Sequence, residues 1–119
     1  MATGRSIPQQ HGAAAEQQAA NFLAGQGLTL ITRNYRCRGG EIDLIAQDGD
    51  TLVFVEVRAR NNSYYGGAAA SITRHKQQRL IYAARHYLMH LANEPLCRFD
   101  AILIDGEHLE WLRSAFDGF

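Results

Sequence analysis

Residues 39–60 read GGEIDLIAQDGDTLVFVEVRAR, and the rest of the chain is organised around this stretch. It contains two apolar runs, one ending at Ala46 and one beginning at Leu52, with the turn Asp48-Gly49-Asp50 between them. An Asp-Gly pair between two apolar runs is typical of a β-hairpin. We therefore predict two antiparallel strands here, which the remaining elements extend or cover.

Acidic residues interrupt both apolar runs of this hairpin. Successive side chains of a strand point to opposite faces, so Glu41 and Asp43 share one face of the first strand. In the second strand Glu56 shares its face with Arg58 and Arg60, and the opposite face is a row of valines. A carboxylate among apolar neighbours is costly to bury without a partner. We therefore expect an arginine, a metal ion or both to lie against these acids.

The composition is that of one globular domain. The chain has 119 residues, of which 46% are hydrophobic, a formal net charge of zero and two cysteines. It has no apolar run near the ~20 residues of a membrane span and no signal-peptide core at its start. Two cysteines without a metal or redox spacing are typical of a reduced cytoplasmic protein. We expect a flexible tail over residues 1–10, a single domain over residues 11–119, no membrane association and a cytoplasmic location.

Residue preference and periodicity predict the elements around the hairpin. A first helix is expected over residues 12–24, with Glu16 on or beside its buried stripe. The apolar face of that helix consists of Ala13, Ala20, Leu23 and Ala24. Thr73 is a good N-cap for a second helix. The other predicted segments are a strand over 28–35, a loop over 61–70, a helix over 74–91 and strands over 99–104 and 108–112.

The order of these elements is α-β-β-β-α-β-β. A strand, a long helix and a further strand form a crossover connection, which makes the third and fourth strands parallel. The hairpin strands are antiparallel, so the sheet is mixed. The predicted fold class is α/β (α+β with a mixed central sheet), with the helices packed on the sheet.

The acids of the hairpin suit two kinds of chemistry. Two carboxylates and a main-chain carbonyl at strand ends are ligands that Mg²⁺ prefers. A metal there would activate water and stabilise charge on a phosphoryl oxygen, while Arg58, two residues after Glu56, could contact the phosphate. The alternative is a structural network of buried ion pairs. The residues alone leave both readings open.

Basic residues predominate between residues 33 and 85, although the whole chain is neutral. Arginine suits bidentate contacts with phosphate. The alternative is an ordinary solvated surface. The arginines that we expect to form a phosphate-contacting rim around the acids are Arg36, Arg38, Arg60, Arg74 and Arg79.

Several short motifs, taken in combination, resemble the small bacterial YraN family. They are Gly39-Gly40-Glu41-Ile42-Asp43-Leu44-Ile45, Val53-Phe54-Val55-Glu56-Val57-Arg58, Tyr65-Gly66, Thr73-x-x-Lys76 and Arg98-Phe99-Asp100, with Glu16 on the first helix. The resemblance covers nearly the whole chain. Members of that family are regarded as predicted nucleases of the restriction-endonuclease-like superfamily, similar to archaeal Holliday-junction resolvases. The resemblance implies a restriction-endonuclease-like core in the order α-β-β-β-α-β.

The resemblance also implies a site for Mg²⁺ or Mn²⁺. The implied ligands are Glu16, Asp43, Glu56 and the carbonyl of Val57. The lysine of the superfamily falls on Arg58, which cannot act as a base because a guanidinium stays charged. Lys76 is the only lysine, so it is the residue that could replace the missing one from another element.

These residues support three hypotheses of function. The first is a Mg²⁺-dependent endonuclease that hydrolyses structured or branched DNA. The second is a module of the same fold that binds nucleic acid without cutting it, as expected if nothing replaces the lysine at Arg58. The third is a scaffold for a protein partner, in which the acids are structural. The partner in the first two is nucleic acid, which in the first is DNA, and a homodimer is compatible with all three.

Overall fold

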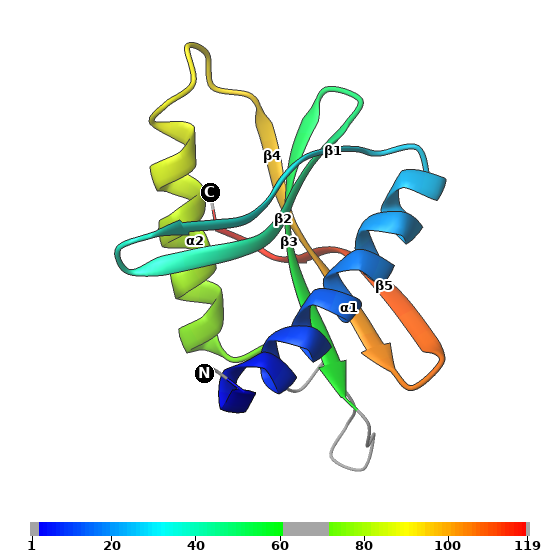
Figure 1. The fold of residues 1–119 in the computed structure, drawn as a ribbon. Helices are drawn as coiled ribbons and strands as arrows, with labels where there is room; N and C mark the ends of the chain where they lie inside the picture. Colours follow the sequence, from blue (N-terminus) through cyan, green and yellow to red (C-terminus); the bar gives the residue numbers. More distant parts are fainter. Residues whose placement is uncertain (1–2, 61–71, 119) are drawn as a thin grey trace.

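In residues 3–60 and 72–118, which the computed structural model describes, two helices cover the two faces of one five-stranded sheet (Figure 1). The predicted loop over residues 61–70 lies outside the described residues. The elements are α1 (Thr3–Gly25), β1 (Thr29–Cys37), β2 (Gly40–Asp48), β3 (Thr51–Arg60), α2 (Arg74–Leu88), β4 (Leu96–Asp105) and β5 (His108–Phe116). This is the order of elements that the sequence predicts.

The strands lie side by side in chain order, β1-β2-β3-β4-β5. All neighbouring strands are antiparallel except β3 and β4, which run parallel from Thr51 opposite Leu96 to Arg60 opposite Asp105. The parallel pair is the one connected through α2, because parallel strands need a long crossover connection. The prediction of an α/β fold with a mixed sheet is therefore confirmed.

Each face of the sheet has its own core. The core on the α1 side includes Ala15, Ala19, Ala20 and Leu23 from the helix and Leu44, Ala46, Val53, Val55 and Val57 from the hairpin. The core on the α2 side includes Leu80, Ala83 and Ala84 from the helix and Ile42, Ile45, Leu52, Phe54 and Phe99 from the sheet. Strands that are buried on both faces read as nearly continuous apolar runs, as the hairpin does.

Helix α1 differs from its prediction in two respects. It begins at Thr3, so the backbone of residues 3–10, predicted as a tail, is helical. Its buried stripe is Ala15, Ala19, Ala20 and Leu23, whereas Ala13 and Ala24 are exposed. Runs of alanine fit more than one helical face, so the sequence predicted a stripe but misplaced its centre. The division into a tail over 1–10 and a domain over 11–119 stays a prediction.

Within the described residues, no helix is both long and apolar enough to cross a membrane.

The ribbon formed by β1 and β2 turns from one face of the sheet to the other at Asn34 and Asp43. The cross-strand pairs that flank these two residues are Arg33–Leu44 and Tyr35–Ile42. Leu44 packs on the α1 side, whereas Ile42, two residues earlier, packs on the α2 side. Residues two apart on a regular strand share a face, so the alternation breaks at Asp43. The predicted alternation of the hairpin therefore holds for β3 but not for all of β2.

The far end of this ribbon lies against α2 (Figure 1). A Cβ atom on Gly40 would stand 2.2 Å from the carbonyl oxygen of Arg79, so only glycine permits this approach. Gly39, with a φ of 100°, lies against the ring of Tyr82. These contacts bring the Glu41 end of β2 to the middle of α2.

Gly40→Ala should lower the free energy of unfolding by about 1–3 kcal/mol, because the added methyl group must displace the backbone of α2. Gly12→Ala is the matched control, since among the described residues nothing beyond the neighbouring backbone of its own helix lies within 4 Å of the Cβ position there. The control should raise stability by roughly 0.5–1 kcal/mol, because alanine is the better helix former. Urea denaturation measures both. A Gly40→Ala protein as stable as the wild type would mean that the ribbon is not held against α2.

Candidate active site

Asp43 lies where β2 separates from β3. The ladder between these two strands ends with Leu44 opposite Val55. Beyond that pair the N–H of Val57 donates to Oδ2 of Asp43 at 2.8 Å. The carboxylate therefore takes the place of a ladder partner and is half-buried in the fork between the strands.

Three carboxyl groups from three elements meet at this fork. Glu16 comes from α1, Asp43 from β2 and Glu56 from β3. Asp43 lies close enough to the other two carboxyl groups that its charge adds to the effect of burial in raising both of their pKa values. Among residues 3–60 and 72–118, no three His, Cys, Asp or Glu side chains form a ready-made cluster for one metal ion. The structure thus brings the three predicted acids together as two pairs that share Asp43, and their role as metal ligands stays a prediction.

Burial raises the pKa of each of these acids. Desolvation and then the charge of Asp43 raise the pKa of Glu56 from 4.5 to about 8. The positive charges of Arg58 and Lys76 oppose this rise. Burial raises the pKa of Asp43, and burial followed by the charge of Asp43 raises the pKa of Glu16. In the absence of a cation, the Glu56 carboxyl therefore keeps its proton at pH values at which an exposed glutamate has lost it.

The donor set fits a small divalent cation. Carboxylate oxygens are the hard ligands that Mg²⁺ and Mn²⁺ prefer. Negative charges crowded into a half-buried site repel one another, and a cation would relieve that repulsion. Val57 contributes its N–H to this site, and its carbonyl stays a predicted ligand.

A small cavity opens beside Glu56. It has a volume of about 130 Å³ and is lined by Glu41, Glu56, Arg58, Lys76 and Arg79. The guanidinium of Arg58 lies 3.7 Å from the carboxylate of Glu56, which is the arginine partner expected for this acid. Lys76 lies in the first turn of α2, and its backbone N–H donates to the hydroxyl of the predicted N-cap, Thr73. Lys76, the only lysine of the chain, therefore lines the same cavity as Glu56, the acid beside which the resemblance implies a lysine.

The arginines predicted as a phosphate-contacting rim are not equally close to the cavity. Arg79 lines it, and Arg36 lies 3.9 Å from Glu41, which also lines it. Arg38, in the turn between β1 and β2, and Arg74, the first residue of α2, are both exposed. The side chain of Arg60 lies outside the described part of the structure. Contact of this set with phosphate stays a prediction.

Residues 15–104 match the family described as "Uncharacterised protein family UPF0102". The chain belongs to this family. A UPF0102 protein of Nitrosomonas eutropha is 63% identical over 107 residues, which cover 89% of this chain and 92% of the relative. A UPF0102 protein of Nitrosospira multiformis is 58% identical over 106 residues, covering 87% and 89%. One of Herminiimonas arsenicoxydans is 54% identical over 115 residues, covering 97% and 90%. The resemblance to the YraN family is thereby confirmed.

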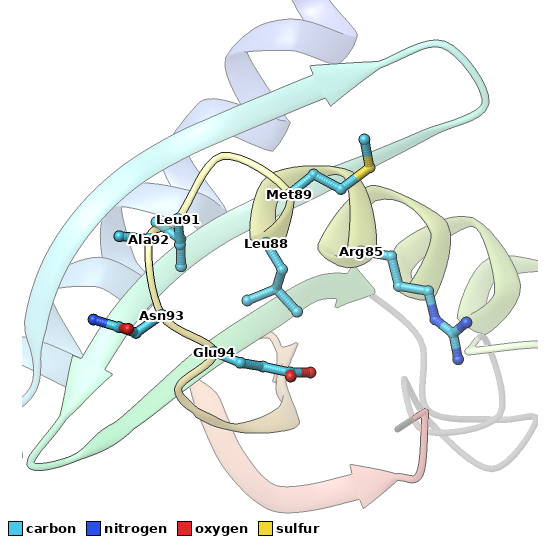
Figure 2. A pocket seen from close by; sticks show the side chains of 7 residues that line it. All are labelled: Arg85, Leu88, Met89, Leu91, Ala92, Asn93 and Glu94. Carbon is cyan, nitrogen blue, oxygen red and sulfur yellow. The ribbon is translucent and has the colours of Figure 1, made fainter.

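A larger cavity of the UPF0102 chain, about 610 Å³, lies at the C-terminal end of α2 (Figure 2). It is lined by Arg85, Leu88, Met89, Leu91, Ala92, Asn93 and Glu94. Glu94 is the one acid among these residues. The lining has no paired carboxylates for a cation, so we assign the chemistry to the smaller cavity beside Glu56.

A second cluster of charged residues in the UPF0102 chain has a structural role that the sequence did not reveal. Asp100 is fully buried in β4 and accepts hydrogen bonds from Arg98 Nε at 3.0 Å and Trp111 Nε1 at 2.9 Å. The backbone N–H of Ser114 donates to the same carboxylate at 2.9 Å. Arg98 also reaches Asp48 at 2.8 Å. The motif Arg98-Phe99-Asp100 therefore ties β4 to β5 and to the turn of the hairpin.

Proposed function

We propose that this chain is a metal-dependent endonuclease that hydrolyses phosphodiester bonds of structured or branched DNA in the manner of a resolvase. The observation that carries the proposal is the placement of Asp43 between Glu16 and Glu56, next to a cavity with cationic walls. Metal-dependent phosphodiester hydrolysis requires carboxylates that can hold a metal ion next to basic side chains that can bind phosphate. A cytoplasmic location, with both cysteines free, belongs to the same proposal.

The roles proposed for the individual residues follow from the positions of their side chains. Bound between Glu16, Asp43 and Glu56, Mg²⁺ or Mn²⁺ would supply a Lewis acid that lowers the pKa of water and offsets charge on the phosphate. Arg58 and Arg79 line the cavity and would hold the phosphate oxygens, because a guanidinium offers paired N–H donors. The carboxyl groups themselves would be ionised in this state, since a nearby cation lowers their pKa values.

The direct test is incubation of the purified protein with four-way junction, flap and linear duplex DNA, in Mg²⁺, in Mn²⁺ and in EDTA. We expect metal-dependent cleavage of the branched substrates in preference to the duplex. Binding of the same DNA without cleavage in either metal would favour the alternative, a nucleic-acid-binding module. The observation that favours this alternative is the arginine at position 58, where the resemblance expects a lysine.

Substitutions of the basic residues in the cavity distinguish a role as a positive charge from a role in proton transfer. Arg58→Lys should preserve or raise cleavage, because lysine keeps the positive charge and can also exchange a proton. Arg58→Ala should reduce cleavage, since a contact with phosphate is lost. Lys76→Ala tests whether the lysine of α2 takes part. Rates under single-turnover conditions measure all three variants, and a dead Arg58→Lys enzyme would show that the guanidinium itself is needed.

Binding of nucleic acid should weaken steeply with salt. Each phosphate that a cationic side chain neutralises on duplex DNA contributes ~0.9 to the slope of log affinity against log salt. The Arg36→Ala/Arg38→Ala double mutant should lose affinity and show a shallower slope. Fluorescence anisotropy of labelled DNA over a salt series measures both quantities in EDTA, so cleavage does not interfere. An unchanged slope in the double mutant would remove these two arginines from the rim.

A further inference from the structure

Asn34 has an unusual backbone conformation in the middle of β1. Its φ is 55°, in the left-handed region that side chains other than glycine rarely adopt. In the described residues, Ser114 is the other non-glycine residue with a positive φ, and it lies in β5. Asparagine tolerates this conformation better than most residues. Backbone strain of this kind is concentrated at functional sites, so its position matters.

The strained residue lies beside the acids of the candidate site. Asn34 is flanked by Arg33, paired with Leu44, and by Tyr35, paired with Ile42, so it is level with Asp43 on the neighbouring strand. This is also the point where the β1–β2 ribbon turns from the α1 side of the sheet to the α2 side. The same turn that breaks the alternation of β2 therefore places Asn34, an exposed residue, directly across from Asp43.

The Asn34 side chain lies close enough to the Glu16 carboxyl of α1 to lower its pKa, against the rise that burial causes. Its amide is a neutral donor, so it can fix a carboxylate without neutralising it as an arginine would. The nearby Arg33 directs Nη1 to the side-chain oxygen of Gln17 at 3.1 Å, which occupies part of its guanidinium. Asn34 on one strand and Asp43 on the next therefore both act on the Glu16 carboxyl, together with the charge of Arg33.

We propose that Asn34 is a positioning residue, which uses its left-handed backbone to hold the Glu16 carboxylate against Asp43 for a divalent cation. The inference rests on the proposed function, because it assumes a cation between these acids. It goes beyond that function by naming a residue outside the ligand set that determines how tightly the cation binds. Groups that orient metal ligands typically contribute 10–100-fold to metal affinity.

Asn34→Gly is the decisive variant, because glycine keeps the positive φ and removes only the side chain. Calorimetry with Mn²⁺ in the absence of DNA should show affinity about tenfold weaker than that of the wild type. The thermal unfolding temperature should stay level or rise, since glycine adopts this φ without strain. Ser114→Gly is the matched control: it changes the other strained position and should leave Mn²⁺ affinity unchanged. Loss of affinity without loss of stability is a result that a purely structural asparagine would not give.

Two other results have distinct meanings. If the wild type binds Mn²⁺ and Asn34→Gly binds it equally well, the positioning role is wrong and the proposed function survives. If the wild type binds neither Mn²⁺ nor Mg²⁺, the metal site is wrong and the positioning role falls with it. Asn34→Ala serves as a control for misfolding. Alanine is strained at this φ, so Asn34→Ala should lose stability as well as Mn²⁺ affinity, whereas Asn34→Gly should lose affinity alone.

Discussion

Asp43→Asn is expected to abolish metal-dependent cleavage and to remove Mn²⁺ binding measured by calorimetry. Asp43 interacts with both Glu16 and Glu56, so its loss removes the carboxylate that joins them. Stabilisation of a phosphoryl group by a metal is worth several kcal/mol, which corresponds to a fall in rate on the order of a thousandfold. An asparagine oxygen can still accept from the N–H of Val57, so the fork itself should remain folded.

Asp50→Asn is the control for this change. It makes the same replacement on an exposed residue at the opposite end of the hairpin, and cleavage and Mn²⁺ binding should both stay at the wild-type level. Retention of cleavage by Asp43→Asn within a few-fold of the wild type would end the nuclease proposal in its present form, because the carboxylate that joins Glu16 and Glu56 would not be needed for cleavage.

The free energy of unfolding of the metal-free protein should fall as pH rises from about 4.5 to about 8. The pKa of Glu56 is raised to about 8 in the folded chain, against 4.5 for an ordinary glutamate. Between these values the folded state holds a proton that the unfolded state has released, so each step upward in pH favours unfolding. The proton on Glu56 stabilises the folded state in full below about pH 4.5. This stabilisation, at most about 5 kcal/mol, is lost as the pH rises through about 8. Urea denaturation at closely spaced pH values measures the slope.

Glu56→Gln isolates the cause of this dependence. The amide cannot ionise, so the fall in stability between pH 4.5 and 8 should become much shallower in the variant. The raised pKa values of Glu16 and Asp43 act in the same direction, so a smaller slope should remain. Mg²⁺ added to the wild type at pH 8 should recover stability, because a cation favours the ionised acids. A slope that is identical in Glu56→Gln would mean that this carboxyl group does not hold the proton.

Local signals were sufficient to predict most of the fold. The Asp-Gly turn defined the hairpin, the Thr73 cap placed the start of α2 at Arg74, and the long connection made β3 and β4 parallel. Each of these follows from residues near one another in the chain. Asp43 and Glu56 could also be identified, because a carboxylate in an apolar run is conspicuous. Lys76 could be named because the resemblance implies a lysine at the site and the chain has no other.

Features that depend on contacts between distant segments were not predictable in this way. The turn of the ribbon at Asn34 and Asp43 has no signal in an apparently regular run of alternating residues. The role of Asp100 required Trp111 and Arg98 to be known as its neighbours. Helix α1 shows the same limit, because only packing against the sheet decides which alanines are buried.

The N–H of Val57, which donates to the Asp43 carboxylate, gives the protein a spectroscopic indicator of its own. A hydrogen bond to an ionised acceptor is shorter and stronger than one to a neutral acceptor, so the resonance of this amide should move when the carboxylate gains or loses a proton. Exchange of its hydrogen with solvent should slow or quicken with the same event. Anything that engages Asp43 must therefore change the signal of one backbone amide, whether or not a phosphodiester bond is cut.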